Sequence, residues 1–156
     1  MSNIFIIHMN HDIGRFHHME EFRKIVGGVY WEGEYVVPCD NNKFKLKIVD
    51  QDQGTFAAKT AKIKMFKYFL ENCDDDYIIV FEDDIIWHKK FYKYWSKTLD
   101  IIKRNDDWKL LYFGVSGSLN KDYINEIKTE EFQIVNLPTD KIFTGAYGFI
   151  LKRDVI

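Results

Sequence analysis

Cysteine is scarce in this sequence, and its scarcity bears on the compartment. The chain of 156 residues contains only Cys39 and Cys73. These two residues do not have the spacing of a metal-ligand motif, and two cysteines are too few for a disulfide framework. Small secreted domains with poor cores usually depend on several disulfides. We therefore expect a reducing, cytoplasmic setting.

Long apolar runs are also missing. No segment approaches the roughly 20 consecutive apolar residues that a transmembrane helix needs. The opening residues 1–4 lack the basic stretch and the long apolar run of a secretory signal. The sequence therefore predicts no transmembrane segment and no signal peptide.

Positive charge is not in excess. Lys and Arg number 22 against 24 Asp and Glu, which gives a net charge of -2. Scattered lysines on a chain with a negative total do not form the clustered basic groove that nucleic acids attract, nor the field that attracts an anionic membrane. Nucleic acid is therefore not an expected partner.

The chain does contain enough apolar material for a core. Hydrophobic residues make up 46% and charged residues 29%, which is the balance of a globular chain rather than a disordered one. A length of 156 residues suits one domain. There are only two prolines, and no repeat or low-complexity linker is visible. We expect a single domain over residues 1–156.

The chain opens with an apolar run, a polar turn and an amphipathic segment. Residues 4–9 predict a strand, and apolar residues at helical spacing predict a helix over residues 15–26 that Gly27 and Gly28 end. A strand, a loop and a helix are the usual start of a nucleotide-binding α/β fold. The glycine fingerprints of dinucleotide-binding and P-loop proteins are missing, so the sequence favours neither class.

Strand and helix patterns alternate along the rest of the chain. Two further helices are predicted, over residues 56–72 and from about residue 89 to 104. Further strands are predicted over residues 35–40, 44–49, 77–81, 108–114, 132–135 and 147–151. This alternation, followed by strands alone, predicts an α/β fold with helices on both faces of a mainly parallel sheet that has a mixed edge.

Three consecutive carboxylates follow the predicted strand at residues 77–81. Glu82, Asp83 and Asp84 repel one another. A hard divalent cation such as Mn²⁺ or Mg²⁺ takes oxygen ligands and would remove that cost. Ligands of open α/β sheets also bind beyond the carboxyl ends of strands. We therefore expect Glu82 and Asp84 to hold a metal, with a solvated acidic strand end as the alternative.

Two other polar residues stand where predicted strands end. His8 follows the first apolar run, where a nucleotide would approach, and the alternative is a partly buried histidine with its own hydrogen-bond partner. Asp40 ends the strand predicted over residues 35–40, where a carboxylate can accept hydrogen bonds from a ribose. The alternative for Asp40 is a turn cap.

The order of these segments resembles the family 25 glycosyltransferases, the lipopolysaccharide and collagen galactosyltransferase group with a GT-A type fold. Residues 6–9 and Arg15 are similar to the family's opening V-I-N-L strand and its arginine. Residues 36–40 resemble its second strand ending in Asp. Gly54 with the helix after it, followed by residues 77–84, resembles its G-x-x-G, helix and L-E-D-D block. Residues 111–114 and 144–149 resemble its L-Y-L-G and G-T-x-x-Y segments.

This chain departs from the family pattern in three places. The family usually has Asn in place of His8, and a Ser-His pair early in the long helix in place of Ala61 and Lys62. Its pattern also continues past the last strand with an acceptor-binding segment, whereas this chain ends at Ile156. The chain is then a fragment, or an unusually short enzyme, or its acceptor binding is supplied elsewhere.

The resemblance implies a GT-A-like, Rossmann-type domain that uses a UDP-sugar and Mn²⁺ or Mg²⁺. Glu82 and Asp84 would hold the metal, and Asp83 would orient the donor sugar or the metal shell. The residues implied to contact the nucleotide are His8, Arg15, Asp40 and, through the metal, Glu82. Inverting enzymes need a general base, and Asp140 is the candidate, the alternative being a base in the segment that this chain does not include.

These expectations describe an inverting transferase acting on a glycan or protein acceptor, in a bacterial or virus-infected cytoplasm. The competing hypothesis is a degenerate glycosyltransferase-like module that binds a nucleotide or glycan without turnover. The presence of Ala61 and Lys62 in place of the family's Ser-His pair favours this competitor. The sequence does not specify the sugar, the nucleotide or the acceptor, because a few contacts around the donor decide them.

Overall fold

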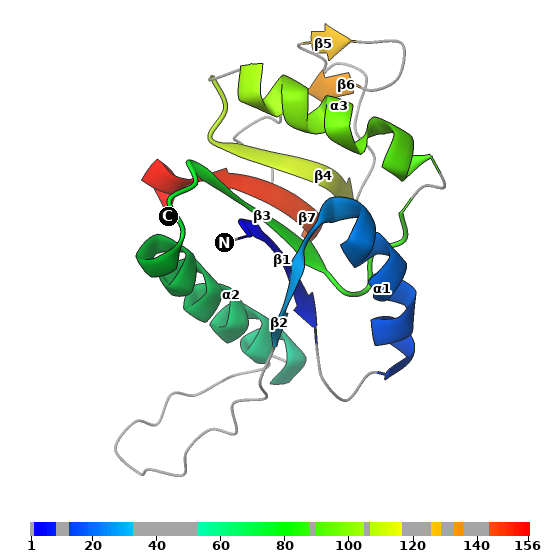
Figure 1. Cartoon of the computed structure of the whole chain (residues 1–156). Coiled ribbons are helices and arrows are strands. Elements are labelled where there is room, and N and C mark those ends of the chain that lie inside the picture. Colours follow the sequence, from blue (N-terminus) through cyan, green and yellow to red (C-terminus); the bar gives the residue numbers. More distant parts are fainter. Residues whose placement is uncertain are drawn as a thin grey trace.

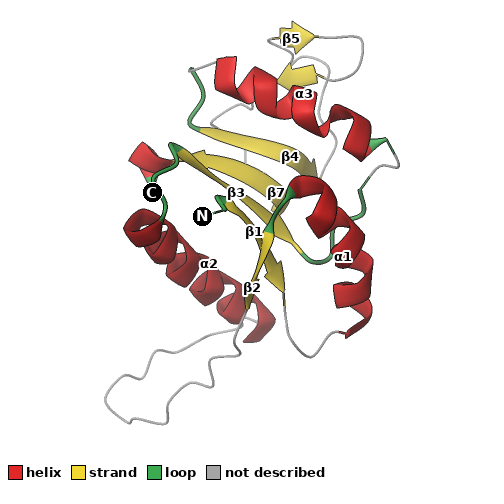
Figure 2. Cartoon of the chain, viewed as in Figure 1, coloured by secondary structure: helices red, strands yellow, loops and turns green. Residues whose placement is uncertain are grey.

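The computed structural model describes residues 2–8, 13–32, 53–87, 90–104, 107–116, 126–128, 133–135 and 144–156. These residues form an α/β structure with a five-stranded sheet, a separate two-stranded sheet and three α-helices (Figures 1 and 2). The α/β class expected from the sequence is thereby confirmed. The strands predicted over residues 35–40 and 44–49 lie outside the described residues.

The helices begin and end close to where the apolar periodicity predicts. They are α1 (Ile13–Val26), α2 (Gln53–Asn72) and α3 (Phe91–Arg104), followed at the end of the chain by a 3₁₀ helix, η2 (Arg153–Val155). Gly27 ends α1 in the left-handed conformation with φ of 72°. Its N–H and that of Gly28 both donate to the carbonyl of Arg23, so the glycine stop that the sequence predicts is confirmed.

The strands of the main sheet lie in the order β2-β1-β3-β7-β4. Their bounds are β1 (Ile4–His8), β2 (Val29–Glu32), β3 (Tyr77–Glu82), β4 (Leu110–Ser116) and β7 (Thr144–Lys152). The first three strands pair in parallel, and β7 is antiparallel to both of its neighbours. The second sheet pairs β5 (Glu126–Lys128) with β6 (Gln133–Val135).

The antiparallel strand lies next to one edge of the sheet. We expected a mixed edge, and β7 lies between β3 and the edge strand β4, so both antiparallel pairs are on that side of the sheet. Because β7 is antiparallel to both neighbours, β3 and β4 run in the same direction with a gap between them that the last strand fills. Periodicity cannot reveal this order, since a strand's apolar pattern is the same wherever it pairs.

The two faces of the sheet carry different helices, as the sequence predicts. On one face Ile6 and Phe81 pack with buried residues of α1 and α3, such as Phe22 and Trp95. On the other face Phe5 packs with buried residues of α2. Figure 1 shows α2 on one side of the strands and α1 and α3 on the other. The alternation along β1 and β3 divides their side chains between these two cores.

Candidate functional site

The carboxyl ends of β1 and β3 meet at one edge of the sheet. The two strands are parallel neighbours, and their register pairs Ile6 with Phe81 and Ile7 with Glu82. His8 and the acidic triplet, about 75 residues apart in sequence, therefore lie side by side where the strands end. The carboxyl edge of parallel strands is also where α/β folds bind ligands.

Asp83 is the centre of a buried polar network at this edge. His8 Nδ1 donates to Asp83 Oδ2 at 3.0 Å, and Arg15 donates to Asp83 Oδ1 at 3.1 Å. His8 and Asp83 are each only 5% exposed, whereas the Arg15 side chain is about half exposed. Both carboxylate oxygens of Asp83 thus have protein partners. This geometry favours a positioning role for Asp83, which holds the His8 ring and the Arg15 guanidinium.

A pocket of about 350 Å³ opens beside His8 and is lined by His8, Ile13, Phe16 and Tyr30. The rings of Phe16 and Tyr30 are 5.1 Å apart between centroids, and each lies within 5.5 Å of the His8 ring. Aromatic walls around a concave space suit a flat ligand ring. Phe16 and Tyr30 were not predicted as site residues. Phe16 belongs to the apolar pattern of the predicted helix, and Tyr30 lies on the short strand β2, which follows the glycine pair and was not predicted.

Tyr30 keeps its proton across the physiological pH range. Burial, and then the negative charge of Glu20, raise the pKa of the Tyr30 phenol to about 12. The Tyr30 hydroxyl donates to Glu20 at 3.3 Å. The hydrogen bonds from Arg23 lower the pKa of Glu20 to about 2, so the Glu20 carboxylate stays charged. Tyr30 is therefore a neutral wall of the pocket.

We expect the Tyr30 phenol to titrate near pH 12 and to return toward its ordinary value near 10 in Glu20→Gln. The folded chain then holds a proton that the unfolded chain releases above pH 10, so stability falls as the pH rises from 10 to 12. Ultraviolet absorbance of the phenolate, taken as the difference between the parent chain and Tyr30→Phe, measures this pKa. A difference spectrum that titrates near pH 10 in the parent chain would contradict the burial of this hydroxyl.

Glu82 forms an ion pair with a lysine of α2. Lys62, from α2, places its Nζ 2.5 Å from Glu82 Oε1, and the two side chains are 26% and 32% exposed. Trp31 of β2 donates its indole N–H to the carbonyl of Ala61 at 3.1 Å, which fixes this turn of α2 at the same edge. The metal ligand predicted at Glu82 thus has an ammonium group as its partner.

Asp84 is exposed in the turn that follows β3. Among the residues that the structure describes, it has no ion-pair partner, and no cluster of three or more His, Cys, Asp or Glu forms a metal site. The segment after Asp84 is anchored, since Ile85 is buried and its carbonyl accepts a hydrogen bond from His18 at 3.1 Å. Asp84 is therefore a solvent-facing carboxylate on a fixed turn.

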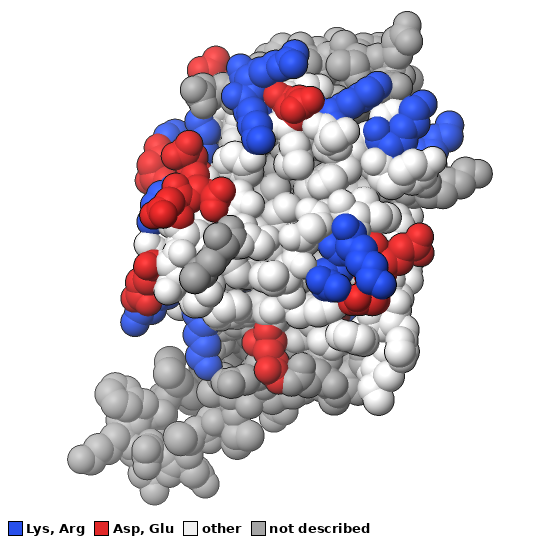
Figure 3. Space-filling model, viewed as in Figure 1, with Lys and Arg blue, Asp and Glu red and all other residues white. Residues whose placement is uncertain are grey.

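The structure brings together only part of the predicted site. His8, Arg15 and Asp83 form one network, while Glu82 is the last residue of β3 and Asp84 lies in the turn after it. Asp40 and Asp140 lie outside the described residues, so their predicted roles stay predictions. Figure 3 shows basic side chains in small groups, separated by acidic and uncharged residues on the face in view. The expectation of no nucleic-acid partner stays a prediction.

The sequence matches no protein-family model and no curated protein. The resemblance to family 25 glycosyltransferases therefore rests on the short motifs and their order in the chain. Within the described residues, none of the helices combines the length and the apolar character needed to cross a membrane.

Proposed function

We propose that the protein is a metal-dependent glycosyltransferase that transfers a hexose from a nucleotide sugar to a hydroxyl of a glycan or protein acceptor in the cytoplasm. UDP is the nucleotide we expect, and inversion the stereochemical outcome, both from the family resemblance. One observation carries the proposal: the same carboxyl edge of the sheet has an aromatic pocket at the end of β1 and two partly or fully exposed carboxylates at the end of β3.

The aromatic pocket would receive the nucleoside. Its rings provide apolar walls for a flat base. Because the Asp83 carboxylate can only accept, the His8 Nδ1 carries a hydrogen, and in the neutral ring Nε2 is then left as an acceptor for a ligand N–H or O–H. Arg15, held by Asp83 and half exposed, would offer its guanidinium to a phosphate. Asp40 is the expected partner of the ribose.

Glu82 and Asp84 suit a divalent cation of the Mg²⁺ or Mn²⁺ type. Such cations are commonly held by one or two carboxylates, with substrate phosphates and water completing the shell. Glu82 is paired with Lys62 through one carboxylate oxygen, which a cation would take over from the ammonium, and Asp84 is exposed to solvent. When bound, the cation would neutralise charge that builds up on the leaving diphosphate. Deprotonation of the acceptor hydroxyl is assigned to Asp140 as the candidate base.

A catalytically degenerate module that binds a nucleotide or glycan is the second candidate. The observation that favours it is the Lys62–Glu82 ion pair, since a lysine occupies one carboxylate oxygen of the proposed metal site. Both candidates share the donor pocket and differ in turnover. A screen of UDP- and GDP-sugars for slow hydrolysis separates them.

We expect UDP to bind only in the presence of Mn²⁺, and Asp84→Ala to weaken that binding by at least about tenfold, the loss that even outer-shell changes cause at metal sites. Titration calorimetry with and without Mn²⁺ measures it. Asp74→Ala is the matched control, because Asp74 is also an exposed aspartate but precedes the other end of β3, and UDP binding should not change there.

The UDP titration and the test for turnover together distinguish the enzyme from the binding module. Metal-dependent UDP binding together with hydrolysis or transfer supports the enzyme, and the same binding without turnover supports the module. If UDP fails to bind the parent chain with or without Mn²⁺, the proposed donor site is wrong. Equal losses in Asp84→Ala and Asp74→Ala would also contradict it, because net charge rather than the site would then govern binding.

A further inference from the structure

Lys62 is held at the strand edge more firmly than a surface lysine. Its Nζ lies 2.5 Å from Glu82 Oε1 and 6.0 Å from the ring centroid of Phe149, and about three quarters of its side chain is covered. The preceding carbonyl, of Ala61, is bound by the Trp31 indole. Three separate strands, β2, β3 and β7, thus contribute a residue that contacts this turn of α2.

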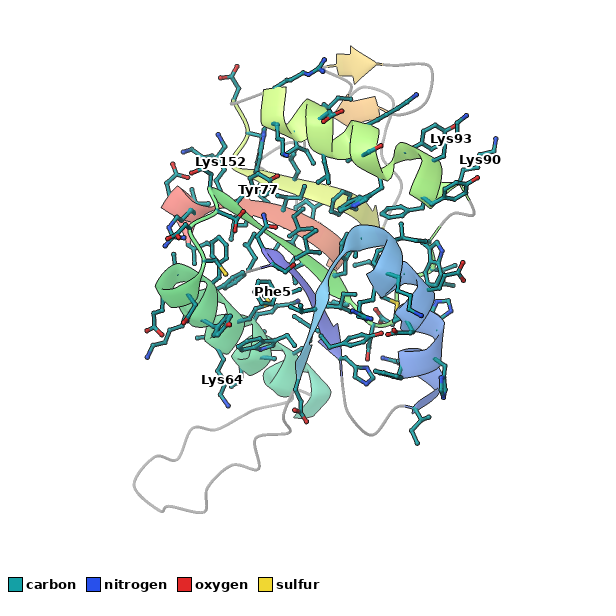
Figure 4. All side chains as sticks on the ribbon, viewed as in Figure 1. Phe5, Lys64, Tyr77, Lys90, Lys93 and Lys152 are labelled. Carbon is teal, nitrogen blue, oxygen red and sulfur yellow. The ribbon has the colours of Figure 1, made fainter. Side chains whose placement is uncertain are left out.

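The other described lysines of α2 differ from Lys62. Lys59, Lys64 and Lys67 are exposed, and Figure 4 shows Lys64 pointing away from the sheet. Lys67 approaches Glu71 of the same helix at 3.9 Å, a surface pair. A partly exposed ion pair adds little to stability, so stability alone is a weak reason for directing Lys62 at the strand end.

The ion pair and a metal would compete for Glu82. A divalent cation on this carboxylate would lie within a few ångströms of the Lys62 ammonium, and like charges at such distances repel. The ammonium would have to leave Oε1. With nucleotide present, the nearest new anion would be the diphosphate on the same cation, and an ammonium on a flexible stem is a common phosphate ligand.

We propose that Lys62 is a diphosphate-binding residue that the metal displaces from Glu82. Without metal its ammonium neutralises Glu82; with metal and nucleotide it contacts the diphosphate and adds positive charge to the donor site. The inference rests on the proposed function, because it takes the metal and the nucleotide from it. It also gives Lys62, which replaces the histidine of the family motif, a role in donor binding.

The test uses the full chain and Lys62→Met, which keeps the length of the stem and removes the charge. Mn²⁺ affinity without nucleotide, measured by the electron-spin signal of free Mn²⁺, should rise about threefold to fivefold because a competing cation is lost. UDP affinity at saturating Mn²⁺, measured by calorimetry, should fall about tenfold because a charge-assisted contact is lost. Lys62→Arg should keep most of the UDP affinity.

A rise in Mn²⁺ affinity together with a fall in UDP affinity would identify Lys62 as a diphosphate-binding residue. A variant that merely disturbs the fold would lower both affinities. Lys67→Met, which removes a lysine paired only on the helix surface, should change neither. If the parent chain shows Mn²⁺-dependent UDP binding and Lys62→Met leaves both affinities unchanged, or lowers both, the inference about Lys62 is overturned while the donor site stands. If the parent chain shows no Mn²⁺-dependent UDP binding, the proposed function fails, and the inference with it.

Discussion

Asp83→Ala is expected to destabilise the fold by about 3 kcal/mol, the lower end of the cost of breaking a buried ion pair. The substitution removes the acceptor of both His8 and Arg15. His8 is 5% exposed and would keep a buried N–H without a partner. Arg15 is half exposed and can return to water, which is why we expect the lower end. Urea unfolding followed by tryptophan fluorescence measures the change.

Asp84→Ala is the matched control for this prediction, because it removes the same side chain one residue further along. Asp84 is exposed, so its loss should change the free energy of unfolding by no more than about 0.5 kcal/mol. Asp83→Asn, which keeps the shape and loses the charge, should fall between the two. Equal stability losses in Asp83→Ala and Asp84→Ala would show that Asp83 does not hold a buried network.

The contrast between these two neighbours also separates stability from binding. If Asp84→Ala loses Mn²⁺-dependent UDP binding and keeps stability while Asp83→Ala loses stability, the triplet divides into residues for the ligand and a residue for the fold. Spacing could not predict this division, since it gives the three carboxylates equal weight. The partners of Asp83 are 68 and 75 residues away, and only the pairing of β1 with β3 brings them near.

The parts of the fold that the sequence predicted are those with strong local patterns. The apolar runs of β1 and β3 and the helical spacing of α1, α2 and α3 depend on neighbouring residues, and the structure confirms these elements. Strand β2 was missed because its four residues follow the glycine pair directly. The aromatic pocket was missed with it, since Tyr30 reaches His8 only after β2 pairs with β1.

The position of β7 between β3 and β4 leads to a second prediction with a large expected effect, at Gly148. The register places Gly148 between Phe81 of β3 and Gly114 of β4. A Cβ at this position would lie 2.6 Å from Phe81 Cδ1 and 3.2 Å from Phe113 Cδ2. The two rings stack on one another at 5.1 Å, and Phe81, which has the closer contact, is buried and cannot yield cheaply. Gly148→Ala should therefore cost about 3 kcal/mol, the upper range for overpacking.

A double-mutant cycle with Phe81→Leu tests the cause of that loss. Leu lacks the ring edge that a new Cβ would strike, so Gly148→Ala should cost less in the Phe81→Leu background, with a coupling of about 1 kcal/mol or more. Urea unfolding of the four chains measures it. Additive losses would mean that Gly148 and Phe81 are not neighbours, and β7 would then not lie beside β3. That result would also undermine the candidate site, because the ring of Phe149 of β7 lies 6.0 Å from the Lys62 ammonium that pairs with Glu82.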